Sequence, residues 1–102
     1  MQEQADEQQA ASDIEEAIAR TILRLLTKRK EGASICPSEV ARAVAGGECQ
    51  NAWRSLMGCT RAVATRLARE GIVEITQKGI RVDPEKVQGP IRIRLRAKSE
   101  DI

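Results

Sequence analysis

Apolar residues recur at helical spacing in three stretches of the chain, and the first runs from residue 14 to residue 26. Its apolar positions return every three or four residues, which is the pattern of an amphipathic helix. The members of this stripe are Ile14, Ala17, Ile18, Thr21, Ile22, Leu25 and Leu26. Ser12 and Glu15 form a capping-box sequence, so we predict that the helix begins at Ser12.

A second, shorter helix is predicted to begin after Cys36. Pro37 suits its first position, because the N–H that proline lacks would have no partner there. Glu39 suits the first turn, and the Gly-Gly pair at residues 46–47 ends the helix. Residues 33–35 are expected to be extended, as a third strand that would support an otherwise marginal hairpin.

The third stretch, from residue 51 to residue 81, organises the rest of the chain. Its first part predicts a helix that ends at Gly71. Gly58 weakens this helix, because glycine costs about 1 kcal/mol relative to alanine inside a helix. We expect either a short helix over 52–57 followed by a main helix over 59–70, or one bent helix. The predicted apolar face comprises Trp53, Leu56, Met57, Thr60, Val63, Ala64, Leu67 and Ala68.

Two strand-forming runs follow, separated by Lys78 and Gly79, and they predict a β-hairpin with a tight turn. Residues 91–96 alternate strictly between apolar residues and arginine, so they predict a further strand. Its arginines are either a row of phosphate contacts or the protective charges of an edge strand.

This order of elements predicts an α+β, mostly helical domain over residues 13–96. We expect a winged helix, in which a three-helix helix-turn-helix core carries a small antiparallel β-hairpin as its wing. Residues 1–12 are expected to be a flexible acidic tail, because no large apolar residue follows Met1. Residues 97–102 are expected to be a frayed C-terminus.

The composition limits the chemistry. The 102 residues suffice for one domain, and with one Trp and no Phe or Tyr its core must be aliphatic. Three cysteines without a CxxC spacing, and no His, argue against a zinc site and a disulfide framework. Cys36 at a helix start is either a reactive thiolate or a half-buried residue without chemistry. We expect no metal and no cofactor.

The sequence also favours a cytoplasmic protein. The acidic, polar N-terminus does not resemble a signal peptide. No apolar run approaches the roughly 20 residues that span a membrane. Unpaired cysteines fit a reducing compartment.

Charge is distributed unevenly along the chain. Residues 1–16 hold six acidic residues and no basic one, whereas the remainder holds all 17 lysines and arginines against nine acidic residues. A basic domain favours an anionic partner such as nucleic acid. The alternative is that the excess charge only keeps the domain soluble.

The face of the third helix opposite its apolar stripe carries four arginines and no acidic residue. Arginine can bind guanine bidentately or clamp a phosphate. The alternative is a solvated helix face, although such faces usually mix both signs of charge. The candidate nucleic-acid-binding residues are Arg54, Arg61, Thr65, Arg66 and Arg69 on the helix, and Gln77, Lys78 and Arg81 at the hairpin tip.

Three segments of the chain resemble a family of small bacterial proteins described as a domain of unknown function. They are ICPSEVARAV (35–44), WRSLM (53–57) and GIVEITQKG with VDPEKVQGPIRIRL (within 71–95), and the resemblance spans roughly residues 18–95. It is loosest at GGECQNA (46–52). The resemblance implies a winged-helix fold, and it implies no activity, cofactor or site residues.

We therefore expect a DNA-binding module, such as a transcriptional regulator, whose third helix enters the major groove of double-stranded DNA. No enzyme is expected, because the chain lacks His, a glycine-rich phosphate loop and metal-ligand spacing. The alternative is a protein-interaction or dimerisation module, because winged helices also serve as docking domains. The acidic tail would then pair with a protein partner, or it would cover the basic face.

Overall fold

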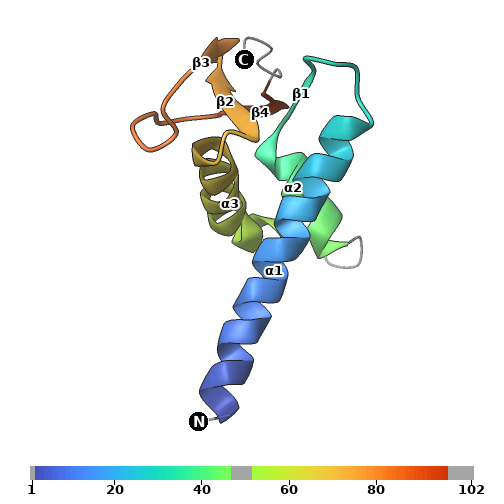
Figure 1. Cartoon of the computed structure of the whole chain (residues 1–102), viewed down its shortest axis with the longest axis vertical. Coiled ribbons are helices and arrows are strands. Elements are labelled where there is room, and N and C mark those ends of the chain that lie inside the picture. Colours follow the sequence, from blue (N-terminus) through green and yellow to red (C-terminus); the bar gives the residue numbers. More distant parts are fainter. Residues whose placement is uncertain (1, 47–51, 97–102) are drawn as a thin grey trace.

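Three α-helices, one 3-10 helix and a four-stranded antiparallel sheet make up the described part of the chain (Figure 1). The computed structural model describes the backbone of residues 2–46 and 52–96 and the side chains of residues 13–46 and 52–96. The elements are α1 (Gln2–Thr27), β1 (Ser34–Ile35), α2 (Pro37–Ala45), η1 (Ala52–Leu56), α3 (Met57–Arg69), β2 (Val73–Gln77), β3 (Ile80–Arg81) and β4 (Arg92–Leu95). The predicted α+β class is confirmed, with about half of the chain helical.

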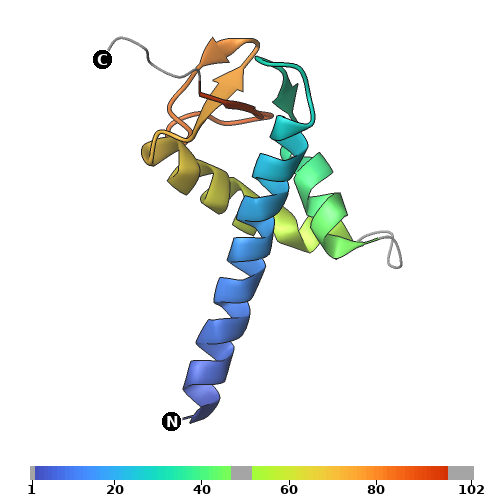
Figure 2. The ribbon, with the colours of Figure 1, turned by 45° about the vertical axis from the view of Figure 1, so that its right-hand side comes forward.

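Helix α1 begins at Gln2 and not at Ser12, so the prediction of its start was wrong. Residues 2–11, expected to be a flexible tail, continue the helix, because their Gln, Glu and Ala residues favour helix. Its N-terminal half projects from the rest of the molecule (Figures 1 and 2). Ile14 is 43% exposed although it belongs to the predicted stripe, whereas Ile18 is fully buried. The core therefore begins at Ile18.

The start and end of α2 follow the local signals in the sequence. Cys36 occupies the N-cap, Pro37 begins the helix, and the Cys36 N–H donates a hydrogen bond to Glu39 Oε1 at 2.8 Å. Gly46 ends the helix with a φ of 82°, which favours glycine. The predicted start and end of this helix are confirmed. Gly47, Cys49 and residues 97–102 lie outside the described residues.

The third helical stretch changes its type immediately before Gly58. The 3-10 helix η1 ends at Leu56 and α3 begins at Met57, which is the predicted short helix followed by a main one. Gly71 has a φ of 82° and ends this stretch, as predicted. Thr60 is buried, and its Oγ1 donates a hydrogen bond to the Leu56 carbonyl oxygen at 2.8 Å. The polar group on the apolar face is thus satisfied by its own helix.

Strand β4 lies inside the sheet, whose order is β1-β4-β2-β3. Ile93 is opposite Ile35 of β1 on one side and Ile75 of β2 on the other. The interpretation of this segment as an edge strand was therefore wrong, because edge assignment depends on long-range pairing. The tight turn at Lys78 and Gly79 is confirmed, with φ values of 55° and 82° respectively.

The core is aliphatic, as the composition predicted. Helices α1, α2 and α3 pack together, and α3 also packs on β2. The buried cluster contains Ile18, Ile22, Leu26, Ile35, Val40, Val63, Ala64, Leu67, Val73, Ile75, Ile91 and Ile93. This packing fixes the apolar face of α3 inward, so its arginine-bearing face is directed outward.

Candidate nucleic-acid interface

The predicted arginines of η1 and α3 are brought to one surface, but each has a neighbour within the protein. Arg54 is exposed, and its guanidinium carbon lies 4.7 Å from the centre of the Trp53 ring. Arg61 Nη1 donates a hydrogen bond to the Gly89 carbonyl oxygen at 3.2 Å. The surface is therefore already connected to the segment that precedes β4.

Two of the arginines form ion pairs with acidic residues from other elements. Arg66 Nη1 lies 4.0 Å from Glu15 Oε1 of α1, and Arg69 pairs with Glu85 of the segment between β3 and β4. These side chains remain between 47% and 66% exposed. Ion pairs at such exposure contribute about 0–1 kcal/mol each, because water screens them. They do not lock the arginines in place.

Small side chains occupy the middle of the outward face of α3. Gly58 and Ala62 are exposed. Thr65 is half-buried, and its Oγ1 donates a hydrogen bond to the Arg61 carbonyl oxygen at 2.8 Å. The predicted contact through Thr65 is thus limited to the acceptor lone pairs and the methyl group of this side chain. A partner could approach the helix backbone closely along this line.

The three hairpin candidates differ in their surroundings. Gln77 Nε2 donates hydrogen bonds to the Gln88 and Pro90 carbonyl oxygens at 2.7 and 3.1 Å, so it holds the segment that precedes β4. Arg81 Nη1 lies 3.6 Å from Glu74 Oε2. Lys78 is exposed in the turn and has no ion-pair partner within the described residues. Lys78 is therefore the hairpin residue best placed to meet an external anion.

The arginines of β4 are not a free row of phosphate contacts. Arg92 Nε and Nη2 donate hydrogen bonds to Ser34 Oγ and the Ser34 carbonyl oxygen at 2.8 and 2.9 Å. Arg94 Nε donates to Glu74 Oε1 at 2.9 Å, across the strand pair. The partners of these two arginines come from neighbouring strands, and a contact of either arginine with phosphate stays a prediction.

Trp53 was expected to belong to the core face, but it is only half-buried. Arg42 of α2 places its guanidinium carbon 4.4 Å from the centre of the Trp53 ring, and Arg54 approaches the same ring. The aromatic ring thus holds two cations at the junction of α2 and η1. The sequence analysis did not include Arg42 among the residues near the candidate interface. Its position in the last turn of α2, the helix that contacts η1, could have indicated that it lies beside Trp53.

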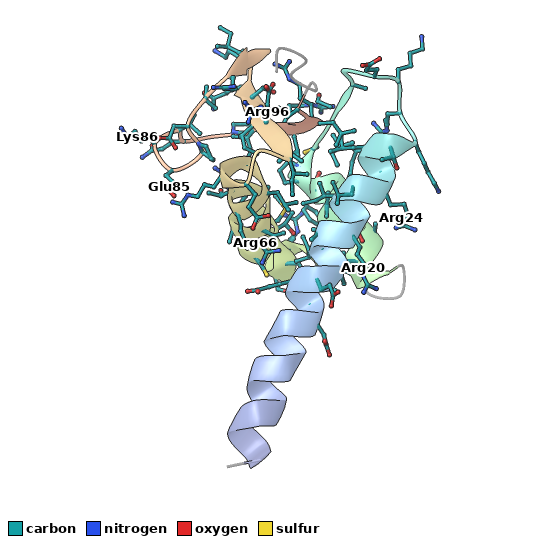
Figure 3. All side chains as sticks on the ribbon, viewed as in Figure 1. Arg20, Arg24, Arg66, Glu85, Lys86 and Arg96 are labelled. Atoms are coloured by element: carbon teal, nitrogen blue, oxygen red, sulfur yellow. The ribbon has the colours of Figure 1, made fainter. Side chains whose placement is uncertain are left out.

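Figure 3 shows how the charged side chains are distributed around the fold. Arg66 lies where α3 meets α1, and Arg24 lies on α1 away from Arg66. Glu85 and Lys86 lie on the loop beside the end of α3. Acidic residues, Glu15 and Glu85, therefore border the basic outward face on two sides. The sequence of α3 alone does not reveal these neighbours, because they belong to other elements.

Other kinds of chemistry find little support in the described residues. No group of three or more His, Cys, Asp or Glu residues there could hold a metal ion. No helix in the described ranges is long and apolar enough to cross a membrane. Burial, and after it the negative charge of Glu15, raises the pKa of the Cys59 thiol, which disfavours its reactive thiolate.

Comparisons with known proteins place the chain in a family. A comparison with curated proteins found no match. The family model described as "Protein of unknown function (DUF3253)" matches residues 15–96, which include all four strands, α2, α3 and the buried part of α1. The chain therefore belongs to the DUF3253 family.

Proposed function

We propose that the protein is a winged-helix module that binds duplex DNA. The succession of α2, η1 and α3 supports a helix-turn-helix, with α3 as the helix that enters the major groove. The hairpin of β2 and β3, with the loop that leads from β3 to β4, supports the role of a wing. This hairpin is the candidate wing expected from the sequence, and Gln77 of β2 also holds the loop that precedes β4.

One observation carries the proposal: the outward face of η1 and α3 has only basic charged residues and has small residues at its middle. Gly58 and Ala62 leave space for a nucleic-acid backbone or base edge. Arg61, Arg66 and Arg69 belong to the same outward face of α3. Arginine at such a position can donate two parallel hydrogen bonds to guanine or to a phosphate.

The ion pairs on this face are compatible with DNA binding. Glu15 and Glu85 hold Arg66 and Arg69 through exposed contacts, so a phosphate can replace either carboxylate at little cost. Each neutralised phosphate also releases counterions, which favours the exchange at low salt. The acidic partners thus reduce the affinity without abolishing it.

Helix α1 limits the direction from which DNA would approach. Glu15 is close to Arg66, so α1 passes along one border of the interface. The acidic residues in its first 16 positions repel phosphates there. The duplex would therefore lie toward the side of α3 that faces segment 78–91.

The test is a fluorescence-anisotropy titration of a labelled random duplex with the full chain, at several salt concentrations between about 50 and 200 mM. Five or six phosphate contacts predict a log-log salt slope of about −4 to −6. The variants Arg66→Gln, Arg69→Gln and Lys78→Gln should each reduce the magnitude of the slope by about one.

The matched control is Arg24→Gln, which removes the same charge from an exposed position on α1 away from Arg66. It should weaken binding much less than Arg66→Gln. A salt-independent signal, or equal losses in both variants, would contradict the proposed interface.

A protein-interaction role is the second candidate, and the projecting acidic half of α1 favours it. Deletion of residues 1–12 separates the two, since the buried stripe of α1 begins at Ile18 and survives the deletion. If the module binds DNA, the deletion should strengthen binding. Absence of DNA binding in both the full and the shortened chain would favour a protein partner with a basic surface.

A further inference from the structure

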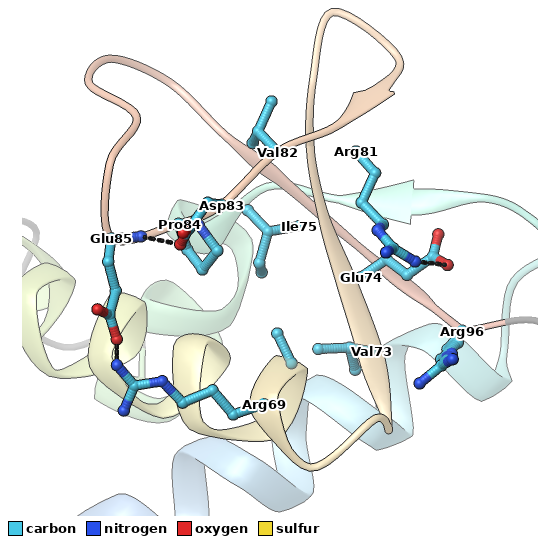
Figure 4. Close-up of a pocket in the computed structure, with 11 residues that line it drawn as sticks. Arg69, Val73, Glu74, Ile75, Arg81, Val82, Asp83, Pro84, Glu85 and Arg96 are labelled. Atoms are coloured by element: carbon cyan, nitrogen blue, oxygen red, sulfur yellow. Dashed lines mark hydrogen bonds and ion pairs between the residues drawn. The ribbon is translucent and has the colours of Figure 1, made fainter.

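A pocket of about 500 Å³ lies between the end of α3, strand β2 and the loop after β3 (Figure 4). Its volume falls in the range of roughly 300–1,000 Å³ typical of small-molecule sites. None of the functions considered above uses this pocket as a whole, and only Arg69 and Arg81 are shared with the candidate nucleic-acid interface.

The lining of the pocket is apolar on one side. Val73 and Ile75 project from β2 toward the side of the loop that carries Pro84, and Ala68 and Val82 complete this part of the lining. Val73 and Ile75 are 2% and 1% exposed, so the half-buried Ala68 and Val82 supply the apolar area that contact with the hydrocarbon portion of a ligand would remove from water. A small inorganic ion has no apolar part and would gain nothing from contact with this side of the pocket.

Most of the charged groups of the lining are already paired. Arg69 pairs with Glu85, and Arg81 pairs with Glu74. Asp83 Oδ1 accepts a hydrogen bond from the Glu85 backbone N–H at 3.0 Å. The lining thus holds three arginines and three carboxylates, so it has no excess of positive charge that would attract a ligand with several negative charges, such as a nucleotide.

Arg96 is the exception, since its side chain has no ion-pair or hydrogen-bond partner among the described residues, although its backbone N–H donates to the Ile72 carbonyl oxygen at 3.1 Å. Its Nη1 lies 3.0 Å from the point that a Cβ of residue 71 would occupy, so the guanidinium lies close against the Gly71 backbone. A larger residue at position 71 would displace it. Within the part of the chain that the structure describes, Arg96 is thus a guanidinium without a partner at the border of a partly apolar pocket.

We propose that this pocket binds a small organic monocarboxylate. The carboxylate would accept two parallel hydrogen bonds from the Arg96 guanidinium, which is the geometry that this pair favours. The apolar body would contact Ala68 and Val82. A single negative charge is expected because the arginines and carboxylates of the lining are equal in number and, among the described residues, only the guanidinium of Arg96 in this lining has no partner.

This site does not depend on the proposed DNA binding, because Arg96, Val73 and Ile75 take no part in that interface. Its test is a titration of the full isotope-labelled chain with benzoate, followed by two-dimensional amide NMR. Benzamide, which has the same shape without the charge, and inorganic phosphate, which has charge without an apolar body, are the comparison probes.

Benzoate should produce saturable shifts in residues 68–75 and 81–85, with clearly weaker shifts for benzamide and for phosphate. Arg96→Gln should weaken benzoate binding by about tenfold, as expected for a lost charged bidentate contact. Lys86→Gln removes a neighbouring exposed charge that does not line the pocket and should leave binding unchanged. Ala68→Leu should block the pocket without changing any charge.

Equal binding of benzoate and benzamide would overturn the role of Arg96, and equal binding of benzoate and phosphate would overturn the role of the apolar lining. Shifts spread over all surface arginines would show non-specific anion binding and would also overturn the site. The amide spectrum of each free variant reports whether it folds, so loss of binding is interpreted only for folded variants. If Ala68→Leu unfolds the chain, the smaller Ala68→Val substitution takes its place.

Discussion

Arg61 Nη1 lies 3.2 Å from the Gly89 carbonyl oxygen and joins the middle of α3 to the loop that leads into β4. Gln77 holds the same loop from β2, through the Gln88 and Pro90 carbonyl oxygens. Helix α3 and the loop that precedes β4 are therefore connected and form one continuous surface. Two residues chosen from the sequence as nucleic-acid contacts thus also have a structural role.

Replacement of Gln77 by alanine should lower the stability of the fold, because two backbone carbonyls lose their donor. The expected loss is about 0.5–1.5 kcal/mol in the free energy of unfolding, measured by urea denaturation. Amide exchange should accelerate in residues 85–90. Gln88→Ala is the control, since only the backbone of Gln88 is used, and a loss as large in this variant would contradict the assignment.

Replacement of Glu85 by glutamine should strengthen DNA binding, because it removes the ion-pair partner of Arg69. Loss of a pair of this exposure predicts an increase of roughly two- to fivefold in affinity at low salt. Glu31→Gln is the matched control, since Glu31 is exposed between α1 and β1, away from α3. An equal gain in the two variants would show only an effect of net charge.

Replacement of Gly71 by alanine should destabilise the protein by about 1–2 kcal/mol, because an L residue is strained at a φ of 82°. The new methyl group would also press on Arg96. Gly58→Ala should have the opposite effect and stabilise the fold by about 0.5–1 kcal/mol, because Gly58 lies in helical backbone with open space around it. Thermal unfolding of both variants measures the contrast.

The cap of α2 should make stability depend on pH in the acid range. The Cys36 N–H, and after it the Arg29 guanidinium, hold the pKa of Glu39 below its ordinary value, against the opposite effect of partial burial. The folded state therefore binds the Glu39 proton less readily than the unfolded state does. The resulting stability is present above the unfolded pKa of about 4.3 and is lost as the pH falls through the folded pKa.

Glu39→Gln removes this titration while it keeps an acceptor for the Cys36 N–H. The stability difference between the native chain and this variant, measured by denaturation at several pH values, should be largest near neutral pH. It should shrink as the pH falls below about 4. A difference that stays constant with pH would contradict the role of the Glu39 charge.

Features with local causes could be predicted from the sequence. Pro37 and Gly71 mark a helix start and a helix end through properties of their own backbones, and both positions are confirmed. Lys78 and Gly79 form the predicted turn for the same reason. The alternating segment 91–96 was recognised as a strand, since alternation is also a local pattern.

Features that depend on distant residues could not be predicted. The central place of β4 follows from pairing with β1 and β2, which no local pattern specifies. The acidic partners of Arg66 and Arg69 come from α1 and from the loop after β3, so the helix sequence gave no sign of them. The start of α1 was misplaced because a capping-box sequence also fits inside a longer helix.

The projecting half of α1 makes the molecule a permanent electric dipole. The molecule is 47 Å long, and its N-terminus lies at one end of the long axis, with six acidic residues in the first 16 positions. The remaining residues carry the excess of positive charge. A polyanion at low ionic strength exerts a torque on such a molecule and turns its acidic end away before contact. The helix would therefore act on the rate of productive encounters without touching the partner.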